Sequence, residues 1–235
     1  MRTIKLIAAC ALFTWAAASF SQTVQPEPLQ NVAQLSASGS VEVQQDLLSI
    51  SMNTTRDGVD ATAVQSQLKQ ALDSALALAK PAAAAGQMEV RTGNFSLYPR
   101  YSKDGKINGW QGSAELVLEG KDFARITTTA GKIQSLTMGG VSFALSREQR
   151  AKVEGEAQNL AVERFRIKAG EIAKSFGFGG YSLREVAINA NDQGYVPRPR
   201  AMAMQAKSEM AESPVPVEAG KSTVLVTVSG SVQMK

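Results

Sequence analysis

The sequence contains no histidine and a single cysteine, Cys10. These absences exclude a Ser-His-Asp triad, a histidine general base and, after residue 10, a cysteine nucleophile or a zinc site with His and Cys ligands. They also exclude an internal disulfide, so stability has to come from a packed core or from assembly with other copies. We therefore predict no catalytic residue, no cofactor and no metal site, and we expect a protein that is not an enzyme.

The chain also has little excess charge, with 25 Lys and Arg residues against 21 Asp and Glu residues. Such a balance gives no strong field for steering a polyanion, so no nucleic acid partner is predicted. Carboxylates are present, but four of them are interspersed with basic residues on one predicted helix face, which is typical of a solvated surface. These are Glu154, Glu156, Glu163 and Glu171, and no spacing singles out a hydrolase pair among them.

The N-terminus has the organisation of a secretory signal peptide. Two basic residues precede an apolar run, Leu6 to Ala18, and small residues precede the bond between Ser21 and Gln22. Residues 1–21 are therefore predicted to be removed by cleavage before Gln22. The apolar run is shorter than the ~20 residues that span a bilayer, so no transmembrane span is predicted; a retained anchor is the alternative.

Cys10 leaves a second alternative open. Ile7 to Cys10 resembles a lipobox, which would make the protein a lipoprotein. The apolar run continues past Cys10, however, and an ordinary signal peptide fits this geometry better. Export predicts a periplasmic protein, with peripheral association with the envelope, or with the outer membrane, left open.

After the signal peptide we expect one folded domain. Residues 22–34 are predicted to be a flexible lead-in, and residues 35–235 the domain itself. Within it, residues 191–221 are rich in proline and show no period, which predicts a long irregular loop. Its methionines could be oxidised reversibly or serve as adaptable contacts. They are Met202, Met204 and Met210.

The stretch from Leu35 to Met52 alternates apolar and polar residues with a period of two, interrupted at Gln44 to Asp46. This pattern predicts either a hairpin or one long strand bent at the interruption. Gly39 predicts a bulge or a close approach of another backbone. Thr223 to Met234 is the expected neighbouring strand, which would place the N- and C-terminal strands side by side.

Between these strands the patterns predict helices at Ala61–Ala79, with a capping box at Thr62 and Gln65, and at Phe123–Leu136, capped by Asp122. A longer helix follows, with a capping box at Ser146 and Gln149 and a stop at Gly177. Its apolar residues could pack on the domain's own sheet, the favoured interpretation, or on a sister subunit. They are Val153, Ala157, Leu160, Ala161, Phe165, Ala169, Ile172 and Phe176.

The resulting order predicts an α+β fold with a mainly antiparallel sheet and packed helices. Its middle part, β-α-β-β-α-β, is similar to a split βαβ arrangement. The Gly-rich segment Gly177–Gly180 follows the long helix and precedes a predicted strand. We therefore interpret it as a helix stop rather than a phosphate loop.

Several segments, in this order and spacing, resemble the SIMPL-domain family, a domain of unknown function. They are Ala37–Val43, Asp46–Leu47, Ile50–Met52, Phe95–Tyr101, Gly109–Ser113, Gly140–Leu145, Ala157–Ala173 and Ser175–Gly177. The family includes bacterial periplasmic immunogenic proteins and an oxidative-stress defence protein. The resemblance implies an exported α+β domain, assembly into ring-like homo-oligomers and a link to envelope or oxidative stress. It implies no catalytic residues.

A hairpin predicted around Ser102–Lys106 carries aromatic and basic residues on and beside its turn: Tyr98, Arg100, Tyr101 and Trp110. Such residues can bind a polymer or ligand, and they are also enriched in subunit contacts and local packing. Two functions are therefore expected. The first is a non-enzymatic periplasmic protein that self-assembles and supports stress tolerance. The alternative is a module that binds an envelope polymer or small ligand through this hairpin.

Overall fold

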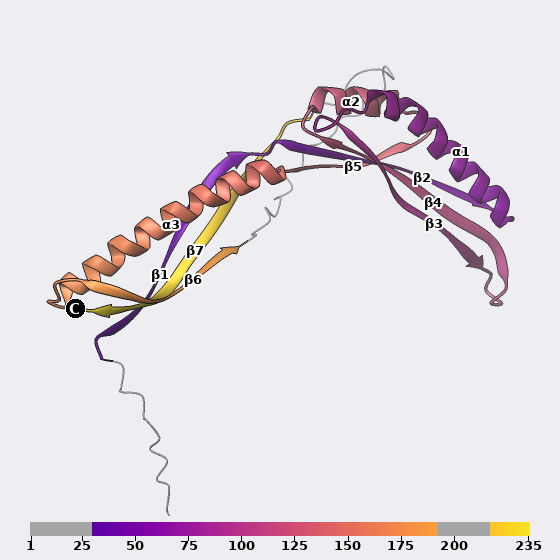
Figure 1. Ribbon diagram of the computed structural model, residues 1–235. Coiled ribbons are helices and arrows are strands. Elements are labelled where there is room, and N and C mark those ends of the chain that lie inside the picture. Colours follow the sequence, from indigo (N-terminus) through magenta and orange to yellow (C-terminus); the bar gives the residue numbers. More distant parts are fainter. Residues whose placement is uncertain (1–29, 192–216) are drawn as a thin grey trace, which may run out of the picture.

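The structure is a computed structural model that describes residues 30–191 and 217–235. The predicted signal peptide with Cys10, its cleavage site at Ser21 and Gln22, and the methionines of the 191–221 segment lie outside the described residues. Figure 1 shows an elongated molecule in which two lobes follow one another end to end. The elements, in chain order, are β1 (Val32–Gln44), β2 (Leu47–Gly58), α1 (Ala61–Ala79), a 3-10 turn (Lys80–Ala82), β3 (Glu89–Tyr101), β4 (Ile107–Gly120), α2 (Phe123–Lys132), β5 (Thr137–Ala144), α3 (Arg147–Ser175), β6 (Tyr181–Asn191) and β7 (Lys221–Met234).

The strands form two antiparallel sheets, with strand orders β1-β7-β6 and β3-β4-β2-β5. This confirms the α+β class with mainly antiparallel pairing. Strands β1 and β7 pair along their whole length, from Val32 opposite Gln233 to Gln44 opposite Lys221. The predicted adjacency of the N- and C-terminal strands is therefore confirmed.

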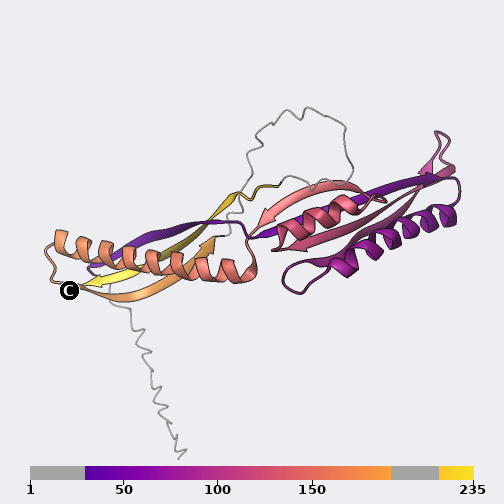
Figure 2. The same cartoon turned by 90° about the horizontal axis from the view of Figure 1, so that it is seen from above.

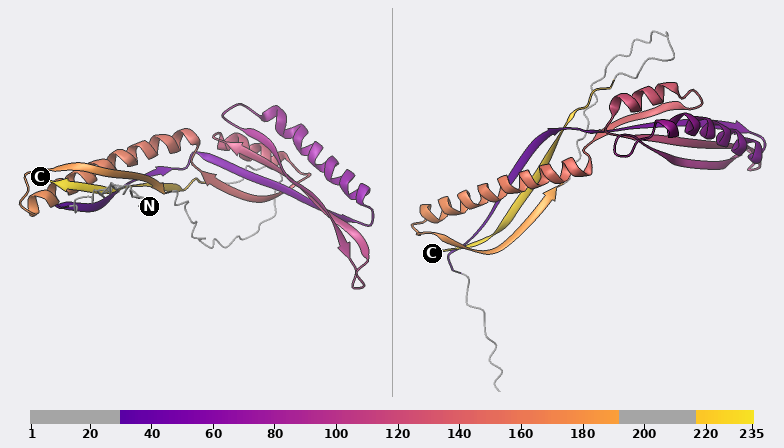
Figure 3. Two further views of the ribbon diagram at one scale, coloured as in Figure 1. Left: turned by 60° about the horizontal axis from the view of Figure 1, so that its bottom comes forward. Right: turned by 45° about the horizontal axis from the view of Figure 1, so that its top comes forward.

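The stretch from Leu35 to Met52 is one bent strand path, and the hairpin alternative is wrong. Strand β1 belongs to the three-stranded sheet and β2 to the four-stranded sheet, so the chain passes directly from one lobe into the other (Figure 3). The bend lies at Gln45 and Asp46. The main-chain N–H of Gln45 donates to the carbonyl of Gly220 (3.0 Å), and its side-chain amide donates to Ser222 Oγ (3.0 Å).

The four-stranded lobe has the predicted split βαβ arrangement, because β2 lies between β4 and β5 in the sheet. Helices α1 and α2 cover one face, over a core that includes Leu48, Ile50 and Leu118. Two local predictions are corrected. The N-cap of α1 is Asp60, whose carboxylate accepts the N–H of Ala63, rather than Thr62. Helix α2 ends at Lys132, because the chain turns to an extended conformation at Ile133.

The three-stranded lobe is built on α3, which lies lengthwise along its strands (Figure 2). Its N-cap is Ser146, as predicted, and its Oγ accepts the N–H of Gln149 at 3.2 Å. At the other end Gly177 adopts a positive φ of 81°, and the N–H of Phe178 reaches the carbonyl of Ala173. This is the Schellman geometry that a glycine stop predicts.

The buried residues of α3 recur at every fourth position: Val153, Ala157, Ala161, Phe165, Ala169 and Ala173. Since a helix has 3.6 residues per turn, this stripe turns slowly around the helix, and a twisted sheet lies beneath it. Packing on the domain's own sheet is thus observed, in the cluster that also contains Val226 and Val228. Leu160 and Phe176, expected on this face, are exposed because they lie outside the four-residue spacing.

Gly39 marks a close backbone approach rather than a bulge. A Cβ atom built at Gly39 would lie 2.1 Å from the carbonyl oxygen of Ala157 and 2.6 Å from the main-chain nitrogen of Ala161. No side chain fits between two backbones at that distance. The glycine and the two alanines therefore decide how closely α3 sits on β1.

We predict that Gly39→Ala lowers the free energy of unfolding by at least ~2 kcal/mol, because backbone rather than a flexible side chain would have to move. Gly140→Ala on β5 is the matched control, since a Cβ atom there would meet nothing closer than Ser51 Oγ at 3.4 Å. Urea unfolding of both variants measures the difference. Equal losses in the two variants would contradict the packing argument.

Candidate functional site

Strand β6 carries three exposed apolar side chains: Leu183 (57% exposed), Val186 (39%) and Ile188 (46%). In the pairing with β7 they lie opposite Val232, Gly230 and Val228 respectively. Because Val228 and Val232 are buried under α3, the three exposed residues point to the helix-covered side of the sheet.

The reason for their exposure is the position of α3. The helix packs mainly on β1 and β7 and barely contacts β6. A helix about 10 Å wide covers roughly two strands that are ~4.8 Å apart, so a third strand remains uncovered. The apolar layer of this lobe therefore continues from the core out to solvent along β6.

The exposed layer extends to α3 at the start of β6. Ile167, which is exposed, and Tyr181 line a shallow depression together with Glu163 and Arg166. The hydroxyl of Tyr181 donates to the carbonyl of Arg166 at 3.4 Å. A contiguous apolar surface with a polar rim is typical of a protein–protein contact. We call Ile167, Tyr181, Leu183, Val186 and Ile188 the β6 surface.

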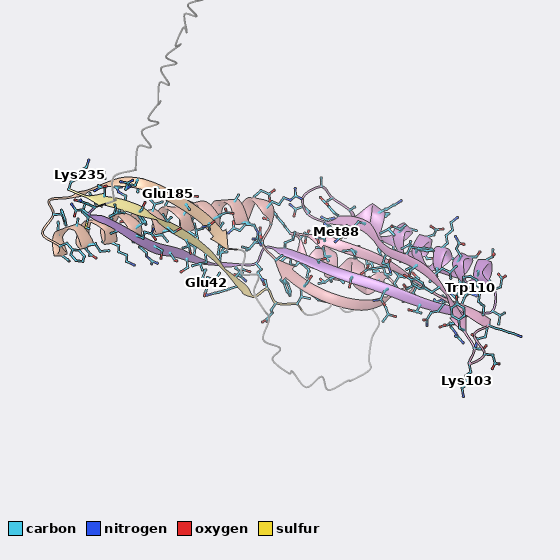
Figure 4. All side chains as sticks on the ribbon, turned by 90° about the horizontal axis from the view of Figure 1, so that it is seen from below. Glu42, Met88, Lys103, Trp110, Glu185 and Lys235 are labelled. Carbon is cyan, nitrogen blue, oxygen red and sulfur yellow. The ribbon has the colours of Figure 1, made fainter. Side chains whose placement is uncertain are left out.

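The predicted hairpin residues lie at the opposite end of the molecule, where Lys103 projects from the turn (Figure 4). Tyr98 (64% exposed) and Arg100 share the sheet face away from α1, and Arg100 donates to Asp57 Oδ1 at 3.0 Å. Tyr101 (62% exposed) lies at the turn. The structure thus brings three of the four predicted residues to the surface of one hairpin.

Trp110, the fourth residue, lies on the other face of the sheet. It is opposite Pro99 in β3 and packs with Leu97 against Val64 and Leu68 of α1. The pleat of the sheet separates Trp110 from Tyr98 and Arg100, although all of them flank one turn. The aromatic and basic residues therefore do not form one continuous surface.

A polar cluster joins the two lobes beside the bend. The carboxylate of Asp46 accepts the N–H (2.7 Å) and the hydroxyl (2.6 Å) of Ser146 at the start of α3. Lys121 lies 2.8 Å from Glu148 and 3.9 Å from Asp46. The hydrogen bond with Glu148 raises the pKa of Lys121, and the same bond is the main cause that lowers the pKa of Glu148.

Carboxylates elsewhere on the described part of the chain do not gather into a metal centre. Within residues 30–191 and 217–235, no three Asp or Glu side chains come together as metal ligands. A hollow beside β1, β6 and β7 has a mixed lining of polar residues, three serines and Gln34 among them, and apolar residues such as Leu35 and Ile172, and Lys168 and Glu185 also line it. Lys168 is already bonded to the carbonyl of Ser36 at 3.0 Å. None of the helices formed by the described residues combines the length and hydropathy needed to cross a bilayer.

Comparison with protein families gives a match to a model described as SIMPL, a protein of unknown function (DUF541), over residues 33–232. The chain belongs to the SIMPL family. The match covers both lobes, so the SIMPL region includes the junction, the hairpin and the β6 surface. A comparison with curated proteins gives no match.

Among solved structures, part of this SIMPL chain is similar to the crystal structure of AtUAH in complex with glyoxylate, at 16% identity and a TM-score of 0.28. The similarity covers 56% of this chain and 34% of that one, so the SIMPL chain spans about a third of that protein's length. At this TM-score the likeness carries no argument about fold or function.

The β6 surface was not predicted as a site from the SIMPL sequence. Val186 and Ile188 were expected only as members of a strand. The spacing of Leu183, Val186 and Ile188, three and then two residues, is a signal of a bulge. It does not say that the strand lies at a sheet edge or that the helix leaves it uncovered.

We predict that Trp110→Ala lowers the free energy of unfolding by about 2 kcal/mol, because it removes a half-buried ring from the contact with α1. Tyr98→Ala is the control, and its effect is expected to stay within about 0.5 kcal/mol since the ring is mostly in solvent. Chemical unfolding measures both values. A larger loss for Tyr98→Ala than for Trp110→Ala would contradict this placement of the two rings.

A second prediction concerns acid stability at the junction. A carboxylate whose folded pKa is lowered stabilises the fold above its unfolded pKa, and this contribution is lost as the pH falls through the folded value. In Glu148→Gln the unfolding temperature should therefore fall less steeply below about pH 5 than in the unchanged protein. Thermal unfolding across pH tests this, with Glu171→Gln on the same helix as the control. Identical slopes for Glu148→Gln and the unchanged protein would contradict it.

Proposed function

We propose that this SIMPL-family protein is a non-enzymatic, exported protein of the periplasm that associates with copies of itself and supports tolerance of envelope or oxidative stress. The observation that carries the proposal is the β6 surface. Its apolar side chains continue the core of the three-stranded lobe into solvent. Covering them would remove apolar area from water, which is the main driving force of association.

The absence of enzymatic activity is supported by the residue types present. The sequence has no histidine, and its single cysteine lies in the predicted signal peptide. In the polar group at the junction, Lys121 forms ion pairs with both Glu148 and Asp46, and Asp46 also accepts the hydroxyl of Ser146. These bonds give the group a structural role in joining the lobes.

Export and the stress role have different support. Export is supported by the basic and apolar N-terminus with small residues before Gln22. The stress role and a ring-like assembly are supported by the family resemblance. Because the exported chain has no disulfide to stabilise it, association with other copies is a further source of stability, which supports the proposed assembly.

A second candidate function, favoured by the exposure of Tyr98 and Tyr101, is binding of an envelope polymer or small ligand at the hairpin. Exposed tyrosines can stack on planar or sugar rings, and Arg100 adds a charged donor beside them. Tyr98→Ala and Arg100→Ala separate this function from folding, because neither side chain is in the core. Thermal-shift screening against glycans should show stabilisation that both variants reduce. If no glycan stabilises the unchanged protein, this candidate fails.

We predict that the exported protein is an oligomer at micromolar concentration. Light scattering coupled to size-exclusion chromatography gives the mass directly, and dilution should shift the population toward smaller species by mass action. A monomer at every concentration would overturn the proposed self-association.

In a strain that lacks the protein, restored survival under oxidant after re-expression would support the stress role, and unchanged survival would contradict it.

A further inference from the structure

Within the described residues the two sheets have four edge strands, and three of them are protected against pairing with another strand. Strand β1 is protected by the long helix, because Arg164 donates to the carbonyl of Ser38 (2.7 Å) and Lys168 to the carbonyl of Ser36 (3.0 Å). Strand β3 has a register shift between Thr92 and Phe95 and contains Pro99. Irregular pairing, proline and covering side chains all hinder edge-to-edge association.

Strand β5 is protected by its shortness and irregularity. It has eight residues, includes Gly139 and Gly140, and changes register where it passes Ser51 and Met52 of β2. Only a few of its main-chain groups can therefore form a regular ladder with an incoming strand.

Strand β6 differs from the other three edges. Its residues 183–190 are all exposed, and no side chain of the described residues hydrogen-bonds to its main chain. Leu183, Val186 and Ile188 add apolar side chains to this open edge. An exposed strand of this kind is a template for pairing with another strand.

The bulge in β6 restricts which strand can pair with it. The register shifts between Leu183 and Glu185, so Arg184 is an extra residue relative to β7. Arg184 donates to Gln233 Oε1 (2.8 Å), which places it on the sheet face away from α3, the same face as Glu185. Two successive residues therefore share one face, and the alternation of the strand is broken at this point.

A partner strand with regular alternation could place its apolar side chains on the α3 side opposite the residues before Arg184 or opposite those after Glu185, but not both. A second copy of β6 running antiparallel has the same break at Arg184 and Glu185, so its apolar residues lie on the α3 side along the whole pair. With the symmetry axis between Arg184 and Glu185, Leu183 lies opposite Val186 of the second copy, and Tyr181 opposite Ile188 of the second copy. All these apolar residues then share the α3 side.

The charges of the strand are complementary in the same register. Arg184 of each copy lies opposite Glu185 of the other, on the face away from α3, so two opposite-charge pairs form around the axis. Opposite charges directly across an antiparallel pair are favourable, and like charges are unfavourable. The sheet faces of the side chains, the apolar contacts and the opposite-charge pairs are therefore all satisfied in the same register.

We propose that β6 is the self-association strand of this protein and pairs antiparallel with β6 of a second copy around a two-fold axis between Arg184 and Glu185. The pairing deepens, and rests on, the self-association proposed above. It joins the two three-stranded sheets into one six-stranded sheet. Because the axis is perpendicular to that sheet, both α3 helices lie on the same side, with the β6 surfaces between them.

A charge exchange tests this register. Arg184→Glu places two carboxylates opposite each other at both pairs around the axis, and Glu185→Arg places two guanidinium groups opposite each other there. Each single variant should weaken association about tenfold. The double variant, Arg184→Glu with Glu185→Arg, restores both opposite-charge pairs and should associate within about threefold of the unchanged protein. A double variant as weak as the single variants overturns the proposal.

A second experiment tests the apolar contact. Val186→Lys should abolish association at micromolar concentration, since it places a charge among apolar side chains. Val141→Lys is the matched control, because Val141 is also a 39%-exposed valine on an edge strand. Circular dichroism verifies the fold of both. Association that survives Val186→Lys, or is lost equally in both variants, counts against the proposal.

Disulfide trapping tests the geometry independently, in a Cys10→Ser background where no other thiol is present. A mixture of Leu183→Cys and Val186→Cys proteins should give a disulfide dimer containing one of each, and neither variant alone should. If the unchanged protein is monomeric, the proposed function fails together with this pairing. If it associates but the variants give the contrary results named above, the pairing alone fails.

Discussion

The three-stranded lobe depends on the contact between Gly39 and the backbone of α3 at Ala157 and Ala161. Because no side chain separates them, the helix lies close over β1 and β7 and is held there by its stripe of alanines. One helix cannot cover three strands at this distance, so β6 remains outside. The openness of β6 is thus a consequence of tight packing elsewhere.

The same contact determines which edge strand of this sheet is covered by α3 and which is exposed. With α3 held over β1, Arg164 and Lys168 are near enough to bond the carbonyls of Ser38 and Ser36. On the β6 side the helix supplies no such cover. The β1 edge is therefore covered by the helix and the β6 edge is exposed, so another strand can add to this sheet only at β6.

The second organising feature is the bend at Gln45 and Asp46, where one strand path serves two sheets. Gln45 bonds Gly220 just before β7 and Ser222 at its start, and Asp46 bonds Ser146 before α3. Segments separated by about a hundred residues or more are held at this point by hydrogen bonds of Gln45 and Asp46. In a chain without disulfides, such bonds and the continuous strand connect the lobes.

Much of the local structure was predictable, because helix caps and stops are decided by neighbouring residues. Asp122, Ser146 and Gly177 have the roles that their spacing predicts. The cap of α1 was mispredicted since Asp60 and Thr62 are both good N-caps, and the end of β2 at Gly58 decides between them. The hairpin residues were recognised as neighbours in sequence, but the pleat places Trp110 on the opposite face from Tyr98 and Arg100.

The sequence by itself determined the family, the antiparallel α+β class and the adjacency of the terminal strands. These depend on residue period, residue size and the order of segments. Only the tertiary structure decided that Leu35 to Met52 is a bent strand rather than a hairpin, and that β6 is an uncovered edge. The first depends on the pairing of β1 with β7, which lies at the other end of the chain, and the second on where a single helix sits over the sheet. Neither is encoded in a local pattern.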